Sequence, residues 1–163
     1  MIEKAFSGNF IEVTNENGIE RVFLKGSVHT FLITEEKKIR LTIEKRLGEE
    51  STKEKIQAGL LEEGEAPLQT AKRELLEELG LEAGNWQELV TQKFTGTIND
   101  SRHYFIARQL VVVSTALDGE ILDTKDYFLE ELYEKAMSGA FSPMSQAAIA
   151  KLHFEVSKGN IEL

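Results

Sequence analysis

Apolar and polar residues alternate in short runs along the chain, and these runs predict strands. Asn17-Gly18 separates the first two runs and is a strong hairpin turn signal. A polar turn at residues 35–38 separates the next two runs. Strands are therefore expected at residues 10–13, 19–24, 28–34, 39–45, 55–57, 86–94 and 103–113.

Three segments have helical rather than strand periodicity. The first begins at Pro67 and ends at Gly80, which matches the preference for proline in the first turn and glycine just past the last. Its apolar stripe consists of Leu68, Ala71, Leu75 and Leu79. The others cover residues 129–137 and a segment that starts at Ser142-Pro143. The order of elements indicates a mixed sheet with helices packed on it.

Three glutamates of the first helix lie away from its apolar stripe. Glu74, Glu77 and Glu78 are neighbours on the helix surface, and the like charges at i,i+4 should destabilise an isolated helix by a few tenths of a kcal/mol. A hard divalent cation reverses this effect, because Mg2+ binds carboxylate oxygens together with substrate phosphates. The simpler interpretation is the solvated face of an acidic helix.

The spacing of the residues around these glutamates identifies a function more specifically than their charge does. Residues 59–81 read Gly-x5-Glu-x7-Arg-Glu-Leu-x-Glu-Glu-x-Gly-Leu, with Gly59, Glu65, Arg73, Glu74, Leu75, Glu77, Glu78, Gly80 and Leu81 at the nine defined positions. This pattern resembles the Nudix box, and the chain is identified as a member of the Nudix hydrolase family. The family hydrolyses nucleoside diphosphates linked to another group.

The resemblance implies a fold, a cofactor and roles for particular residues. It implies an α/β/α sandwich with a mixed sheet, formed by a single domain over residues 1–163. Mg2+, for which Mn2+ can substitute, is expected on Glu74, Glu77, Glu78 and the backbone carbonyl of Ala58. Arg73 is expected to orient Glu77, with Glu65 as a further partner of Arg73. Glu77, Arg73 and Glu120 are the catalytic candidates, and the number of metal ions stays open.

The general base also stays open between Glu120, Asp123 and a glutamate of the box. Both Glu120 and Asp123 lie in residues 117–124, which are expected to form a loop after the last predicted strand. Related pyrophosphatases place an acidic residue in this loop, whereas an acidic surface loop is the simpler interpretation.

The flanks of the box resemble those of ADP-ribose and other nucleoside-diphosphate-sugar pyrophosphatases. Residues 58–65 follow that group's Ala-Gly-x-x-Glu-x-Gly-Glu pattern, and Arg46 resembles its substrate-contacting arginine. Residues 1–26 resemble its N-terminal hairpin, which commonly builds a dimer, so a homodimer is expected. Gly96 and Arg102 are further candidates for substrate binding. Two departures, Thr95 and Gln57, stand where the group usually has proline.

Composition narrows the class of protein. The chain has 163 residues with 41% hydrophobic and 29% charged residues, which suits one globular domain. A net charge of -9 argues against nucleic acid as a partner and is compatible with a small nucleotide if cations neutralise the site. The absence of cysteine excludes disulfides, thiolate zinc sites and a cysteine nucleophile. No apolar run or signal pattern suggests a membrane, so a cytoplasmic location is expected.

Two groups of alternatives remain. The enzyme could instead hydrolyse nucleoside triphosphates or dinucleoside polyphosphates. Alternatively, the chain could be a non-catalytic sensor of nucleotide sugars, although intact Glu77 and Glu78 argue against it. The three histidines, His29, His103 and His153, are widely spaced and are expected to be structural.

Overall fold

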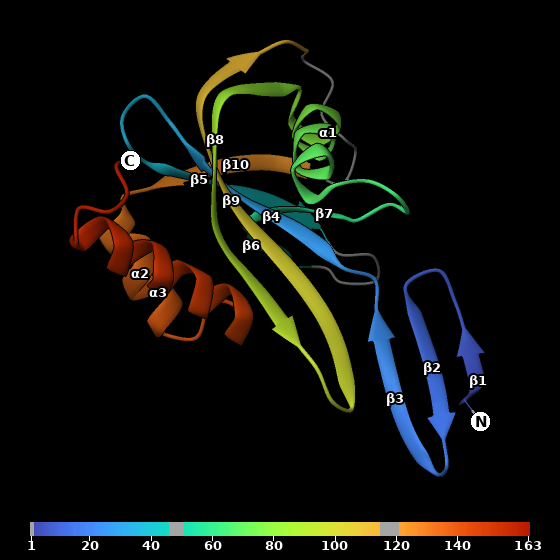
Figure 1. Ribbon diagram of the computed structural model, residues 1–163. Coiled ribbons are helices and arrows are strands. Elements are labelled where there is room, and N and C mark those ends of the chain that lie inside the picture. The colour runs from blue at the N-terminus through green and yellow to red at the C-terminus, as the bar shows by residue number, and fades with distance from the viewer. Residues whose placement is uncertain (1, 46–50, 115–120) are drawn as a thin grey trace.

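The computed structural model describes residues 2–45, 51–114 and 121–163, and Figure 1 shows their arrangement. The strands are β1 (Ile2–Ser7), β2 (Ile11–Glu16), β3 (Ile19–Leu24), β4 (Ser27–Ile33), β5 (Ile39–Lys45), β6 (Thr52–Lys55), β7 (Gln57–Leu60), β8 (Leu81–Phe94), β9 (Ile98–Val112) and β10 (Ile121–Tyr127). The helices are α1 (Pro67–Leu79), α2 (Leu129–Met137) and α3 (Pro143–Ser157). Among the described residues, no helix has the length and apolar character needed to cross a membrane.

The strands form one curled, mixed sheet. Its order is β1-β2-β3-β9-β4-β5-β10, with β8 on the other edge of β9. β9 pairs in parallel with β3 and then with β4, whereas the other pairs are antiparallel. α1 covers one face, and α2 and α3 cover the other (Figure 1). This arrangement confirms the expected α/β/α sandwich.

Alternate residues of the central strands supply the two halves of the core. Phe31, Tyr104 and Ile106 point to one face, where they pack with Leu132 of α2 and Ile149 of α3. The neighbouring residues on the opposite face pack against α1 in two smaller clusters that contain Val28, Leu32, Leu75, Leu79, Phe105 and Ala107. Because side chains alternate along a strand, the same strands hold both helical layers in place.

The segment 52–60 enters the sheet between two diverging strands. β4 and β5 pair only beside their turn, at Leu32↔Arg40 and Ile33↔Ile39. Beyond that point β6 pairs with β5, and β7 pairs with β4. The insertion brings Gln57 and Gly59 of β7 beneath α1.

Helix α1 has the predicted boundaries. Pro67 occupies its first turn, and Gly80 closes it with φ 62° and a hydrogen bond from its N–H to the Leu76 carbonyl. This left-handed conformation suits glycine because it has no Cβ. Three of the four stripe residues are buried, but Leu68 is exposed and that part of the prediction was wrong.

The sequence prediction missed β1 and β10, and it gave one strand at residues 55–57 where the structure has two, β6 and β7. The N-terminal segment contains β1 as well as β2 and β3, so it is a three-stranded sheet rather than a hairpin. Its β1 residues are all exposed and show no buried alternation. Part of the expected loop at 117–124 belongs instead to β10, whose residues are mostly polar and whose buried residue is Ile121. In both strands, backbone pairing rather than a hydrophobic pattern sets the structure.

Candidate functional site

The exposed face of α1 is organised around Arg73. Its guanidinium contacts Glu65 through Nε and Nη2 at 3.3 and 3.2 Å, and Nη1 lies 2.9 Å from carboxylate oxygens of both Glu74 and Glu77. The contacts with Glu65 and Glu77 follow the spacing noted in the sequence, whereas the contact with Glu74 was not expected. One planar cation therefore fixes three carboxylates.

Glu78 and Glu74 face the inserted strand β7. The Gln57 side chain donates a 2.9 Å hydrogen bond from Nε2 to Oε2 of Glu78. A Cβ at Gly59 would overlap the side chain of Glu74, so only glycine allows this close approach. Ala58 lies between these two contact residues in β7, opposite His29 of β4. Consequently, Ala58, Glu74 and Glu78 meet where α1 crosses β7.

Burial makes this a costly place for negative charge. It raises the pKa of Glu78 to about 7, with Glu74 and Glu44 adding repulsion against the opposing hydrogen bond from Gln57. Burial also raises the pKa of Glu74, against the attraction of Arg73. Desolvation and like charges are the usual causes of such shifts. A cation would relieve both costs.

The possible metal ligands at this place are of the chemical type that a hard divalent cation prefers. They are carboxylate oxygens, and the buried Oε1 of Gln57 and Oγ1 of Thr30 have no hydrogen-bond partner among the described residues. In residues 2–45, 51–114 and 121–163, however, no three acidic or histidine side chains converge on one metal position. Arg73 holds Glu74 and Glu77, while Gln57 holds Glu78. Metal binding requires these side chains to rotate, and exposed ion pairs such as Arg73–Glu77 resist by only about 0.3–0.5 kcal/mol.

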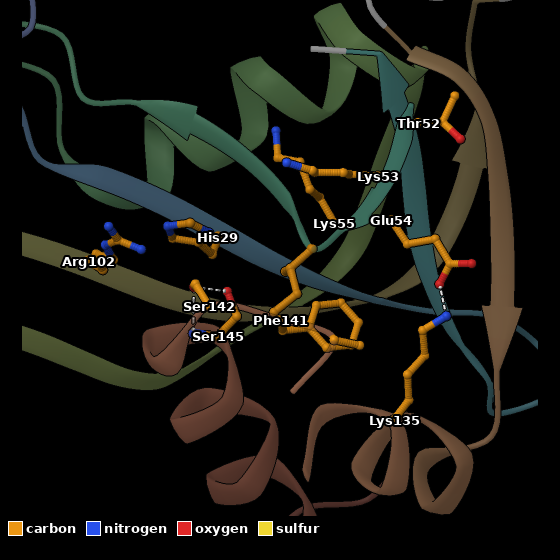
Figure 2. A pocket seen from close by; sticks show the side chains of 12 residues that line it. His29, Thr52, Lys53, Glu54, Lys55, Arg102, Lys135, Phe141, Ser142 and Ser145 are labelled. Carbon is orange, nitrogen blue, oxygen red and sulfur yellow. Dashed lines mark hydrogen bonds and ion pairs between the residues drawn. The ribbon is translucent and has the colours of Figure 1, made fainter. Parts of the chain in front are cut away.

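A cleft of about 610 Å³ lies between the inserted strand and the start of α3 (Figure 2). This volume is within the range of small-molecule sites. Its lining residues are His29, Thr52, Lys53, Glu54, Lys55, Ile56, Arg102, Lys135, Ala140, Phe141, Ser142 and Ser145. Lys55 links the cleft to the acidic face of α1, because it forms an ion pair with Glu44 and both of these residues influence Glu78 electrostatically.

Arg102 and His29 form one wall of this cleft. The Nε of Arg102 donates a 2.9 Å hydrogen bond to Asp100, whose side chain is only 4% exposed. His29 stacks on Tyr104 with ring centroids 4.8 Å apart. Burial, together with Arg102 and Lys55, lowers the pKa of His29 to about 3, so the imidazole is neutral at physiological pH. His29 was expected to be only structural, yet it lines the cleft.

The structure brings together only some of the predicted site residues. Glu74, Glu77, Glu78 and Arg73 share one face of α1, and Arg102 lines the adjoining cleft. Gly96 lies in the β8–β9 turn and is not among the residues that line the cleft. Asp123 is exposed on β10, where its carboxylate accepts a hydrogen bond from the Thr124 N–H. Arg46 and Glu120 lie outside the described residues.

Several cleft residues were missed by the sequence reasoning. Lys53 and Lys55 are two residues apart on β6, a spacing that signals a shared side, but the expected strand began only at Lys55 and Lys53 was assigned no element. Ser142 was interpreted only as a helix start, and Ser145 and Lys135 carry no local signal. These residues converge through long-range packing, which a single sequence does not reveal.

Comparison with known proteins places this geometry in a family. The family model described as NUDIX domain matches residues 24–147. ADP-ribose pyrophosphatase of Bacillus subtilis (strain 168) is 35% identical over 122 residues, which cover 68% of this chain and 65% of that protein. The matched region thus spans slightly less than two thirds of the relative's length.

Solved structures share the fold at lower identity. An ADP compounds hydrolase gives a TM-score of 0.74 at 20% identity, covering 99% of this chain and 95% of that one. A NUDIX hydrolase from Nitrosomonas europaea gives 0.64 at 23% identity, with 79% and 88% covered. The E. coli ORF135 protein gives 0.67 at 17% identity, with 82% and 91% covered.

Proposed function

This chain belongs to the Nudix family, and we propose that it is a hydrolase that cleaves the diphosphate of ADP-ribose or a similar nucleoside-diphosphate sugar with Mg2+. The products are a nucleoside monophosphate and a sugar phosphate. The observation that carries this proposal is the acidic face of α1, which adjoins a cleft of nucleotide size. The relative from Bacillus subtilis, an ADP-ribose pyrophosphatase, supports the choice of substrate.

The metal-binding roles fall on Glu74, Glu77, Glu78 and the carbonyl of Ala58. When bound, the divalent cation supplies charge neutralisation for the diphosphate and lowers the pKa of a water. Arg73, whose Nη1 lies 2.9 Å from carboxylate oxygens of Glu77 and Glu74, orients both side chains before they rotate toward the cation. Mn2+ is expected to replace Mg2+, because both are small octahedral ions, whereas Ca2+ takes longer and looser coordination.

The remaining steps concern protons and positioning. Glu120 is the proposed general base, with Asp123 and a box glutamate as the alternatives, because one of these carboxylates must reach the attacking water. Lys55 and Arg102 supply positive charge along the cleft, and Arg46 is a proposed phosphate contact. Phosphoryl transfer depends mainly on positioning and electrostatics, so no protein nucleophile is needed.

We also propose that the protein is a cytoplasmic homodimer built through its N-terminal sheet. Phe6 and Phe10 are 56% and 60% exposed, and Ile2 and Ile19 are similarly open to solvent. Contiguous exposed apolar residues commonly mark a protein interface. The sheet contacts the rest of the chain through a short parallel pairing of β3 with β9, which leaves its apolar residues available to a second copy.

A substrate screen tests the proposed function. ADP-ribose, GDP-mannose, oxidised dGTP and diadenosine polyphosphates are each incubated with the protein in Mg2+, Mn2+, Ca2+ or excess EDTA. We expect the highest kcat/KM for a nucleoside-diphosphate sugar with Mg2+ or Mn2+, and none in EDTA. A triphosphate or dinucleoside polyphosphate at least tenfold better than every diphosphate sugar would favour the alternative substrate class.

Two substitutions test the metal assignment within the same screen. Glu77→Gln and Glu78→Gln should each reduce kcat by more than about tenfold, which corresponds to about 1.4 kcal/mol of barrier. If a variant retains more than a tenth of the wild-type kcat, the replaced glutamate is not a metal ligand. If no compound is hydrolysed under any condition, the sensor interpretation replaces the enzyme.

A further inference from the structure

A glutamine side chain is completely buried beneath α1, beside the glutamates of its acidic face. Gln57 is 0% exposed and lies in β7, opposite Thr30 of β4. Its Nε2 donates a 2.9 Å hydrogen bond to Oε2 of Glu78, while its Oε1 has no hydrogen-bond partner among the described residues. The amide is therefore used at one end only, and that end contacts Glu78.

Stability alone does not explain an amide at this place. A buried polar atom without a hydrogen bond destabilises the folded chain. Methionine has nearly the same length as glutamine and would fill the site without burying an unpaired oxygen. A partly satisfied buried amide calls for a reason other than packing. That reason is to be sought in what the Nε2 of Gln57 does to Glu78.

The donor is fixed by the sheet, whereas the acceptor is flexible. Each of the four residues of β7 pairs with β4, and Gln57 and Gly59 face α1 together. Glu78 reaches the amide from the helix through a side chain with several rotatable bonds. The hydrogen bond therefore limits the rotation that metal binding requires of Glu78 to orientations that keep one oxygen against the amide.

The other groups around Glu78 act through charge. Glu74 and Glu44 repel its carboxylate, and Lys55 attracts it. These forces are less directional than a hydrogen bond. A carboxylate has about four lone-pair sites, so the bond with Gln57 leaves others for a cation. Carboxylates that bind metal ions are commonly held in this way by a group that does not touch the ion.

We propose that Gln57 is a positioning residue, which orients the Glu78 carboxylate for a divalent cation without contacting the ion itself. The role of Glu78 as a metal ligand rests on the proposed function. Hydrogen-bond partners of metal ligands typically contribute about 10- to 100-fold to metal affinity. Gln57 should therefore affect metal binding through Glu78 alone.

A Mn2+ titration tests this role without any substrate. Electron paramagnetic resonance of the free ion gives the Kd of Mn2+ for the wild type, Gln57→Met and Gln57→Asn. Methionine keeps the length of the side chain but cannot donate, and asparagine keeps the amide but is shorter. We expect each variant to raise the Kd about tenfold or more. Circular dichroism checks that each is folded, and the second variant carries the test if the first is not.

A double-mutant cycle separates positioning from a general effect on the fold. In Glu78→Gln the carboxylate that Gln57 orients is already lost. Adding Gln57→Met to this variant should therefore change the Kd of Mn2+ by less than about twofold. A merely structural role of Gln57 would instead raise the Kd by the same factor in both backgrounds.

Two further substitutions serve as matched controls. Gln92 of β8 resembles Gln57 in its bonding, because its Nε2 donates to the Met144 carbonyl at 3.4 Å and its buried Oε1 has no partner among the described residues. Thr30→Val alters the residue that pairs with Gln57 and removes a buried hydroxyl that likewise has no described partner. Gln92→Met and Thr30→Val should both bind Mn2+ as the wild type does.

Four results would overturn the positioning role. They are no binding of Mn2+ by the wild type at millimolar concentration, an unchanged Kd in both Gln57 variants, an equal loss in the Glu78→Gln background, and losses of the same size in the controls. The proposed function is judged separately by hydrolysis in Mg2+. Coupling between Gln57 and Glu78 without hydrolysis of any compound retains the positioning role and rejects the enzyme assignment, whereas hydrolysis with an unchanged Kd does the reverse.

Discussion

Replacing Glu78 with glutamine should stabilise the protein in the absence of divalent cations, in a way that depends on pH. The carboxylate of Glu78 is largely buried beneath α1 beside Glu74 and Glu44. Glutamine has nearly the same shape and keeps an oxygen that can accept the 2.9 Å hydrogen bond from Gln57. The substitution therefore removes the charge while the packing and this contact remain.

The sign of the effect follows from the pKa of Glu78, which is raised from 4.5 to about 7 by burial. Below pH 4.5 the carboxyl is protonated in both the folded and unfolded chain and costs nothing. Between pH 4.5 and 7 the unfolded chain loses its proton first, so the free energy of unfolding falls as pH rises. Above pH 7 the cost is constant at about 2 kcal/mol, after allowance for partial exposure to solvent.

Denaturant unfolding in excess EDTA at pH 4.5 and pH 8 measures this difference. We expect Glu78→Gln to match the wild type at pH 4.5 and to exceed it by about 2 kcal/mol at pH 8, equivalent to a rise of about 4–8 °C in Tm. Glu77→Gln is the matched control, because its side chain is 58% exposed and loses only a surface ion pair with Arg73. Its stability should change by less than 1 kcal/mol at either pH.

Two results would refute this reasoning. If Glu78→Gln is less stable than the wild type at pH 8, the carboxylate is not destabilising where it lies. If the gain is the same at both pH values, ionisation is not its cause. A gain of equal size in Glu77→Gln would assign the effect to the general relief of negative charge on α1.

Other changes probe the remaining parts of the structure. Gly59→Ala should lower the free energy of unfolding by about 1–3 kcal/mol and reduce kcat, because the added methyl group overlaps the side chain of Glu74. An unchanged free energy of unfolding and an unchanged kcat would show that α1 moves to accommodate the methyl group. Phe6→Ser combined with Phe10→Ser should convert the expected dimer to a monomer in sedimentation experiments, and a persistent dimer would place the interface elsewhere. Thr95→Pro should raise kcat/KM for ADP-ribose if this position alone separates the chain from the ADP-ribose group, and an unchanged value would exclude that explanation.

The sequence predicted the elements whose side chains are partly buried in a regular pattern. Strands β3 and β5 and helix α2 have the predicted bounds, and α1 begins and ends where Pro67 and Gly80 indicated. In these elements local preference, periodicity and end signals agree. Strands β1 and β10 lack that agreement, because one is exposed throughout and the other is mostly polar. Their pairing partners, rather than their composition, determine their conformation.

The candidate site likewise contains residues whose proximity the sequence predicts and residues whose proximity it does not. Glu74, Glu77, Glu78 and Arg73 lie within one turn and a half of one helix, so their proximity follows from helical geometry alone. Arg102 and Ser145, by contrast, come from β9 and α3 and meet only after α3 packs on the sheet. The Gln57 contact with Glu78 likewise depends on the insertion of β7 between diverging strands. Contacts between residues so far apart in the sequence depend on tertiary packing.

The inserted segment 52–60 makes the fold intolerant of odd changes in length. Ile56 packs in the core beneath α2, while Gln57 and Gly59, at alternate positions, face α1. Deleting one residue upstream of Gln57 would exchange these two sets, because each residue along a strand reverses direction. Backbone pairing with β4 and β5 could persist, yet Glu78 would lose its amide partner. Homologous chains that vary in length here should therefore differ by two residues, or place the change in the turns on either side.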